Sequence, residues 1–427
     1  MKFYKVDGRN LQTVLNEILS GRLSLDYYVP LVKPIIDDVR SRGDKALLEY
    51  VRKFDYGGAS LERLRLQRSE LAEAYSRLDE KLRAALNTAA ENIRKLCQHL
   101  LRRLRTSRSL AEGVRVLQRP APIPSVGCYV PGGGASYPST VLMTVVPAKV
   151  CGVPYVAVCT PPSKTGEVPD VVKAALYVAG ADEAYSMGGP HAIAAMAYGT
   201  ESVRRVAKIV GPGGPYVTAA KKLVSQDVAI DMLAGATELV VYGEDVDDSE
   251  DIAFELCAQS EHSPDTFVGL VTTSENLASE VMKYLDIMVP RLERGDVVRQ
   301  ALERNGFVAV CDKVSTAVEL IQKLAPEHLY LASSPNKIAP KITSAGLISA
   351  GRHTSPVLCD YIVGVNHILP TSGQAALRGG LSVMDFVKIV TEVRVSKAAA
   401  RRLGRHAGLL ARAEGLMAHA YAAERWL

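Results

Sequence analysis

The run Val126-Gly127-Cys128-Tyr129-Val130 is apolar, and Pro131-Gly132-Gly133-Gly134 follows it directly. A short apolar run that is bounded by a glycine-rich turn is typical of a buried β-strand. The apolar stretch from about residue 138 to 150 then predicts a helix. A strand, a turn and a helix in this order indicate the first unit of a parallel α/β sheet.

The same alternation continues along the chain in two series. In the first series we expect strands at 126–130, 155–159, 184–187, 206–210 and 228–231, with helices at 138–150, 168–179, 192–198 and 215–224. In the second series we expect strands at 239–242, 266–272, 306–310 and 329–331, with helices at 248–261, 275–286 and 313–324. Two such series predict two Rossmann-like, doubly wound α/β domains.

The predicted domain boundaries follow changes in this pattern. Residues 1–25 are expected to form an N-terminal arm, and residues 26–129 and 236–381 a discontinuous first α/β domain. Residues 130–235 are expected to form the second α/β domain, which carries the glycine-rich turns. Residues 382–427 are expected to form a helical tail. A tail of this kind cannot bury itself, so we expect it to pack on a partner subunit or a neighbouring domain.

Composition narrows the class of protein. The chain has 427 residues, 48% hydrophobic and 23% charged, with a net charge of +5. This charge is too mild to indicate a nucleic-acid partner, and the run Arg102-Arg103-Leu104-Arg105 is interpreted as a solvated helix face. The seven cysteines form no CxxC pair and indicate core residues in a reducing compartment. No stretch approaches the ~20 apolar residues of a membrane helix, so we expect a soluble, cytoplasmic protein that binds no membrane.

Three glycine-rich turns join predicted strands to predicted helices. They are Gly132-Gly133-Gly134, Gly188-Gly189-Pro190 and Gly211-Pro212-Gly213-Gly214-Pro215. Glycines let backbone N–H groups approach a phosphate at a helix N-terminus, and ligands of α/β sheets bind beyond the carboxyl ends of the strands. The turns therefore indicate a phosphate-bearing ligand, although tight turns alone would also explain them.

Gln259-Ser260-Glu261-His262 ends an apolar helical stretch, and Pro264 prevents that helix from continuing. Residues three apart share one face of a helix, so Gln259 and His262 would point the same way. An imidazole and an amide oxygen suit a nitrogen/oxygen metal site. A helix end exposed to water is the alternative.

Further polar groups accompany this segment. Glu327 and His328 stand next to each other before a predicted strand, where a carboxylate and an imidazole could act as base and acid. Asp360 precedes the dense polar stretch 366–373, which is typical of a functional loop. Glu414 and His419 lie in the tail. Taken singly, these groups could also be exposed loop or helix residues.

As a set, these segments resemble the histidinol dehydrogenase family. The resemblance runs from about residue 30 to the end and rests on segments 129–133, 137–143, 211–213, 231–235, 259–262, 325–329, 360–361, 366–373 and 414–419. It implies a zinc-containing, NAD-dependent homodimer that oxidises L-histidinol to L-histidine through the aldehyde. Sites in such a dimer are expected to be completed by the partner's tail.

The resemblance also implies roles for individual residues. One zinc per active site would be bound by Gln259, His262, Asp360 and His419, and the catalytic pair would be Glu327 and His328. Substrate contacts would fall on these six residues together with Glu414 and Thr237, where the family usually has serine.

Cofactor contacts would fall on Tyr129, His191 and Gly214. The family usually has lysine, glutamine and asparagine where this chain has Gly134, His191 and Gly214, so the cofactor contacts are expected to differ. Two other functions remain open. One is a zinc- and NAD-dependent dehydrogenase of the same fold that acts on another amino alcohol or a sulfonated polyol, and the other is a non-enzymatic α/β binding protein.

Overall fold

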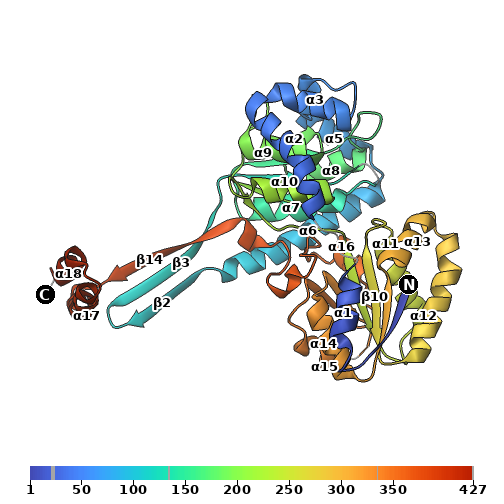
Figure 1. The fold of residues 1–427 in the computed structure, drawn as a ribbon. Helices are drawn as coiled ribbons and strands as arrows, with labels where there is room; N and C mark the ends of the chain where they lie inside the picture. Colours follow the sequence, from blue (N-terminus) through green and yellow to red (C-terminus); the bar gives the residue numbers. More distant parts are fainter. Residues whose placement is uncertain (21–24, 133–134, 334, 426–427) are drawn as a thin grey trace.

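The computed structural model describes residues 1–20, 25–132, 135–333 and 335–425. Two parallel sheets lie side by side, and a long arm extends away from them and carries the C-terminus (Figure 1). The mixed α/β class with parallel sheets is as predicted. No helix within the described ranges is long and apolar enough to cross a membrane.

The first parallel sheet has five strands in the order β6-β5-β4-β7-β8. Their bounds are Glu183–Ser186 (β6), Val156–Thr160 (β5), Val126–Tyr129 (β4), Lys208–Val210 (β7) and Ala229–Ile230 (β8). Successive side chains of a strand point to opposite faces, so Cys128 packs in the core on one face of the sheet and Tyr129 packs in the core on the other face. Both faces are covered, which explains why the predicted strands are apolar runs without polar alternation.

The helices that cover this sheet come from both sides of β4 in the chain. They are Tyr28–Arg42 (α2), Asp44–Phe54 (α3), Leu61–Leu64 (α4), Arg68–Arg77 (α5), Glu80–Arg103 (α6), Pro138–Val150 (α7), Asp170–Ala179 (α8), Gly189–Tyr198 (α9) and Pro215–Val224 (α10). The prediction placed residues 26–129 with 236–381, but α2–α6 pack on the five-stranded sheet. The reason is that their apolar stripes face α7–α10, which a local pattern cannot specify.

The second parallel sheet has six strands in the order β1-β11-β10-β9-β12-β13. Their bounds are Lys2–Val6 (β1), Phe307–Cys311 (β11), Phe267–Thr272 (β10), Glu238–Gly243 (β9), His328–Leu331 (β12) and Leu347–Ala350 (β13). The covering helices are Leu11–Leu19 (α1), Ser249–Ser260 (α11), Glu275–Met288 (α12), Gly295–Asn305 (α13) and Val314–Leu324 (α14), with Pro335–Ile338 (α15) and Pro356–Tyr361 (α16) nearby. Residues 1–25 were predicted to be an arm, yet β1 pairs in parallel with β11. The edge position of β1 explains its exposed, weakly apolar sequence.

The arm is an antiparallel sheet of three strands, β14-β3-β2, followed by two helices. Their bounds are Val387–Val395 (β14), Val114–Pro122 (β3), Thr106–Ala111 (β2), Lys397–Ala413 (α17) and Met417–Glu424 (α18). Residues 382–427 were predicted to be helical throughout, but 387–395 pairs with β3 along its whole length. Helices α17 and α18 pack against each other at the far end of the arm, remote from both sheets (Figure 1).

Candidate active site

A cavity of about 430 Å³ lies between the two parallel sheets. It is lined by the carboxyl edge of the five-stranded sheet, through Pro131 after β4 and Gly213–Pro215 after β7. It is also lined by the amino edge of the six-stranded sheet, through residues 233–238 before and at the start of β9 and Glu327 before β12. The expectation that the ligand site lies beyond the carboxyl ends of the strands therefore holds only for the five-stranded sheet. In the second sheet the polar residues precede the strands, so the parallel strands bring them together at the opposite edge.

Glu327 and His328 stand at the amino end of β12 and are both buried, with 7% and 3% of their surfaces exposed. Burial lowers the pKa of His328, which favours the neutral imidazole that a base requires. Burial also raises the pKa of Glu327 well above its ordinary value, and the nearby charges of Glu238 and Asp360 act in the same direction. Burial thus favours the neutral form of both groups.

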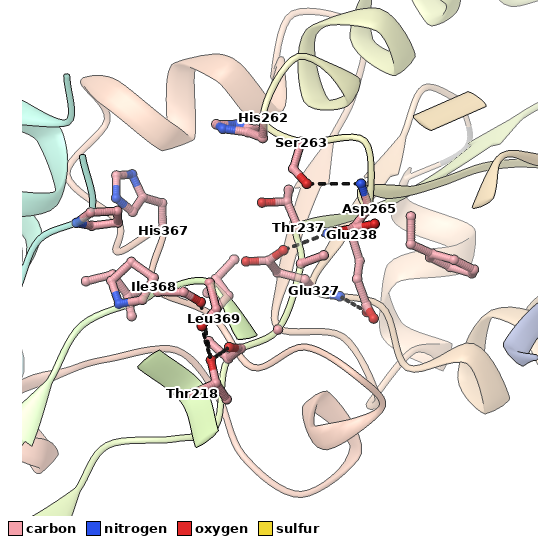
Figure 2. Close-up of a pocket in the computed structure, with 18 of the residues that line it drawn as sticks. Thr218, Thr237, Glu238, His262, Ser263, Asp265, Glu327, His367, Ile368 and Leu369 are labelled. Carbon is pink, nitrogen blue, oxygen red and sulfur yellow. Dashed lines mark hydrogen bonds between the residues drawn. The ribbon is translucent and has the colours of Figure 1, made fainter. Parts of the chain in front are cut away.

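The carboxylate of Glu327 is bound to its neighbouring strand. Its Oε2 accepts a hydrogen bond of 2.7 Å from the Glu238 N–H, and the Glu327 N–H donates one of 3.3 Å to Glu238 Oε2. Figure 2 shows this reciprocal pair of bonds between the two residues. The sequence prediction did not include Glu238 among the site residues. Glu238 could have been recognised because it is an acidic residue at the start of a buried apolar strand and follows Thr237, a predicted substrate contact.

Gln259, His262 and Asp360 also line the cavity. Gln259, in α11, donates a hydrogen bond of 2.9 Å from Nε2 to Asp360 Oδ2, in α16. The Gln259 Oε1 and Asp360 Oδ1 atoms are buried and have no hydrogen-bond partner among the described residues. Just beyond α11, His262 is exposed to the cavity, and desolvation by the surrounding protein lowers its pKa.

These donors fit a zinc ion. An amide oxygen, a carboxylate oxygen and a neutral imidazole are ligands that zinc accepts. Two of the oxygens accept no hydrogen bond, and Asp360 Oδ1 lies 3.6 Å from His328 Nε2. Buried polar atoms without hydrogen bonds are costly unless a ligand satisfies them. The described residues contain no group of three or more His, Cys, Asp or Glu side chains that could hold a metal. The predicted set has only two such side chains in this chain, His262 and Asp360, because its third ligand is the Gln259 amide.

The fourth predicted ligand, His419, lies elsewhere in the same chain. It is exposed in α18, at the far end of the arm, and Glu414 is exposed just before that helix. Figure 1 shows that α18 is remote from both parallel sheets. One chain therefore brings together three of the four predicted ligands, and neither Glu414 nor His419 reaches its own cavity.

Comparison with known proteins gives the family. The family model described as histidinol dehydrogenase matches residues 21–426. Histidinol dehydrogenase of Methanothermobacter thermautotrophicus is 42% identical and covers 100% of this chain and 99% of its own, and that of Archaeoglobus fulgidus is 41% identical and covers 95% and 98%. The crystal structure of histidinol dehydrogenase from Elizabethkingia anophelis superposes with a TM-score of 0.94 at 32% identity, covering 100% of this chain and 98% of that one.

This chain belongs to the histidinol dehydrogenase family. It is therefore an oxidoreductase, and its family membership supports a role in histidine biosynthesis. The resemblance that was inferred from the motifs is confirmed across the whole chain.

The predicted cofactor residues occupy different positions relative to the cavity. Gly214 lines the cavity, in the turn after β7 and directly before α10. Tyr129 and His191 are buried and do not line it. The Tyr129 hydroxyl accepts a hydrogen bond of 3.0 Å from the Gly189 N–H and so supports the second glycine-rich turn from behind. Gly134 lies outside the described residues.

His191 contacts a carboxylate and two aromatic rings within the protein. Its Nε2 lies 2.8 Å from Asp55 Oδ2, and the same oxygen accepts a 3.0 Å hydrogen bond from the Gly188 N–H. The imidazole also stacks with the rings of Tyr50 and Phe54. A carboxylate of the protein thus already occupies the anion-binding end of α9, which the sequence of the turn does not reveal.

The remaining substrate position, Thr237, lines the cavity directly before β9. His367, a histidine of the polar stretch 366–373 that was not assigned a role from the sequence, also lines it. The Nδ1 of His367 lies 2.7 Å from the Asp360 carbonyl oxygen, and its Nε2 lies 3.4 Å from Thr140 Oγ1. His367 thereby joins the Asp360 segment to α7 of the other sheet.

Proposed function

We propose that the protein oxidises L-histidinol to L-histidine through L-histidinaldehyde, the last two steps of histidine biosynthesis. The overall change removes two hydrides and consumes one water, so two NAD molecules are reduced for each alcohol oxidised. The observation that carries this proposal is the cavity of a histidinol dehydrogenase family member in which Glu327, His328, Gln259, His262 and Asp360 meet.

We assign one zinc per active site to Gln259, His262 and Asp360 of one chain, with His419 from the tail of a second copy. The two buried oxygens without partners support this assignment. Bound zinc would orient the substrate and polarise it as a Lewis acid. Thr237 and Glu414 are assigned to the substrate, the first from the chain that holds the cavity and the second from the arm of the other copy.

The NAD site is assigned to the turn after β7, where Gly213 and Gly214 line the cavity. Bound NAD would accept hydride from the substrate carbon. Tyr129 and His191 would support the neighbouring Gly188-Gly189 turn through the contacts that hold its backbone N–H groups. The cofactor contacts of this chain would accordingly be made by backbone more than by side chains.

His328 is assigned as the base for the hydroxyl proton of the alcohol. Its lowered pKa supports this role, because a base must be unprotonated before it acts. Glu327 is assigned as the group that activates the water that adds to the aldehyde. Its raised pKa makes the ionised carboxylate a stronger base than an ordinary glutamate.

We propose a homodimer whose arms complete each other's sites. In one chain the helices at the end of the arm expose apolar side chains, among them Leu409, Leu410 and Tyr421 at 66%, 68% and 62%. Apolar surface of this kind is typical of an interface. A second copy that covers α17 and α18 would bury it and would also bring His419 to a cavity.

The test is NADH formation with L-histidinol by zinc-loaded protein. We expect about two NADH per histidinol consumed, because oxidation of the alcohol to the acid transfers two hydrides. Other amino alcohols and a sulfonated diol are assayed in parallel. Faster reduction of NAD with one of these would assign a different substrate to the same chemistry, and failure to bind zinc or to reduce NAD would favour a binding protein.

A further inference from the structure

The carboxylate of Glu238 contacts two separate segments of the site. Its Oε2 accepts a hydrogen bond of 3.3 Å from the Glu327 N–H, and its Oε1 accepts one of 2.9 Å from the Ser372 N–H. Glu238 is 2% exposed and starts β9, the neighbour of β12 in the sheet. Glu238 therefore joins the start of β12 to the polar loop 366–373.

These bonds arise from the geometry of the amino edge. Buried backbone N–H groups need acceptors, and the N–H groups of Glu238 and Glu327 each find one in the other's carboxylate. The exchange leaves the Glu327 carboxylate with one oxygen bound to the Glu238 backbone. Figure 2 shows its second oxygen turned away from that bond. The rotamer of Glu327 is thus set by the strand that Glu238 begins.

We propose that Glu238 is a positioning residue: its carboxylate binds the Glu327 N–H and so holds the start of β12 where the Glu327 carboxylate can accept the Glu238 N–H and keep the orientation needed to activate water. This inference rests on the proposed role of Glu327 in the aldehyde stage. Glu238 itself touches no reacting atom in this proposal, since its two oxygens are bound to the backbone of Glu327 and Ser372.

The charges near Glu327 favour this role over simple capping of two strands. The carboxylates of Glu238 and Asp360 both raise the pKa of Glu327. Asp265 is the other carboxylate that lines the described cavity, together with the imidazoles of His262, His328 and His367. A neutral polar side chain could cap a strand equally well, whereas a buried second carboxylate next to Glu327 carries an electrostatic cost. Such a cost is typical of functional sites.

The test is the variant Glu238→Gln. Glutamine has one acceptor oxygen and an NH₂ group that only donates, so it can satisfy only one of the Glu327 and Ser372 N–H groups. In single-turnover assays we expect oxidation of the aldehyde to slow by roughly 10- to 100-fold, because small displacements of a positioned group have effects of this size. The slowing of alcohol oxidation should be smaller by a factor of about ten or more, since His328 is held in place by the strand β12 to which it belongs.

Glu183→Gln is the matched control. Glu183 also begins a buried strand, β6, and accepts hydrogen bonds from the hydroxyls of Tyr155 and Tyr185. It belongs to the other sheet and does not line the cavity. We expect this variant to lower the melting temperature while both half-reactions keep their ratio.

Two outcomes would overturn the proposal. Equal slowing of both half-reactions by Glu238→Gln, together with a lower melting temperature, would make Glu238 a strand cap alone. An unchanged Glu327 side chain in the crystal structure of that variant would do the same. If the variant does not fold, Glu238→Asp replaces it, because aspartate keeps the charge but is too short for both bonds, and selective slowing of the aldehyde stage is again expected.

The role of Glu327 is tested separately by Glu327→Gln. If this variant oxidises the aldehyde at the normal rate, the proposed function of Glu327 fails, whatever Glu238 does. If it is inactive toward the aldehyde while Glu238→Gln is not selectively impaired, the positioning role alone is wrong.

Discussion

Gln259 donates its side-chain amide to Asp360 Oδ2 at 2.9 Å, and this bond turns the amide oxygen of Gln259 away from the carboxylate. The Gln259 Oε1 and Asp360 Oδ1 atoms remain without hydrogen-bond partners in the described part of the chain. An unsatisfied buried polar atom costs about 1–3 kcal/mol. One cation that binds both oxygens would remove both costs.

The first prediction concerns this metal site. Chelation should abolish activity, and zinc or manganese should restore it. Asp360→Asn should weaken zinc binding by roughly 100-fold or more, since the loss of groups that only support a ligand already costs about 10- to 100-fold. Zinc content after dialysis measures this directly. The control is Asp44→Asn, because Asp44 is similarly buried, at 8% against 9% exposed. Full activity of metal-free protein would contradict the assignment.

The second prediction concerns the dimer. His262→Ala and His419→Ala subunits should each be inactive, but a mixture should regain activity if the arm of one chain completes the site of the other. A hybrid dimer has one intact site of its two, so random exchange of equal amounts should restore about one quarter of the wild-type activity. Subunit exchange is followed with two different tags. Exchange without recovery would mean that each site is built within one chain.

The third prediction separates the two catalytic residues. His328→Asn should slow oxidation of the alcohol by roughly 100- to 10,000-fold, the usual cost of losing a general base. Glu327→Gln should slow oxidation of the aldehyde far more than that of the alcohol. Zinc content should be unchanged in both variants. Equal slowing of both stages by Glu327→Gln would assign it a positioning role and exclude water activation.

The fourth prediction is the pH dependence of the aldehyde stage. The pKa of Glu327 is raised well above its ordinary value of 4.5, and the residue acts in its ionised form. The rate of aldehyde oxidation should therefore fall as the pH is lowered through this raised pKa, at a higher pH than an ordinary glutamate would give. In Glu327→Gln the residual rate should lack this acid limb. If the fall in rate at low pH persists in the variant, it reports the protonation of a group other than Glu327.

The fifth prediction concerns a buried ion pair next to the glycine-rich turn after β7. The Lys221 ammonium and the Asp231 carboxylate contact each other with almost no exposure, and they bind the carbonyl and the N–H of Gly211, each at 2.8 Å. Gly211 has φ of +115°, and an added Cβ would lie 2.1 Å from the Tyr129 carbonyl oxygen, so only glycine fits there. Lys221→Met should destabilise the fold by about 3–5 kcal/mol, because it leaves a buried carboxylate unpaired.

Denaturant unfolding measures this effect, and Lys222→Met is the control. Lys222 is the neighbouring residue on α10, and its side chain is 47% exposed. Its loss should change the free energy of unfolding by less than about 0.5 kcal/mol. Similar effects of the two substitutions would show that the buried pair contributes little.

Many of the strands carried their own signal in the chain. The apolar runs that form β4, β5, β9 and β10 are long enough, and are bounded clearly enough by turn residues, to be recognised without tertiary contacts. Five of the described strands were missed: β1, β2, β3, β13 and β14. Most of their residues are exposed or partly exposed, and β1, β3 and β14 pair with strands that are distant in the chain. Their sequences therefore resemble those of a loop or a helix when they are considered alone.

For the site, the sequence by itself determined which chemical groups are present and which of them are neighbours in the chain. Glu327 and His328 are adjacent at the start of one strand, and Gln259 and His262 are three residues apart where one helix ends, because these relations are local. In the structure the helix α11 ends at Ser260, so His262 lies just beyond it. Only the tertiary structure decided that Asp360 meets Gln259, that Glu238 holds Glu327, and that His191 pairs with Asp55. It also decided that His419 lies at the end of an arm, away from its own cavity. The physical reason is that these relations depend on strand order and helix packing, which join distant segments and leave no periodic signal in the sequence.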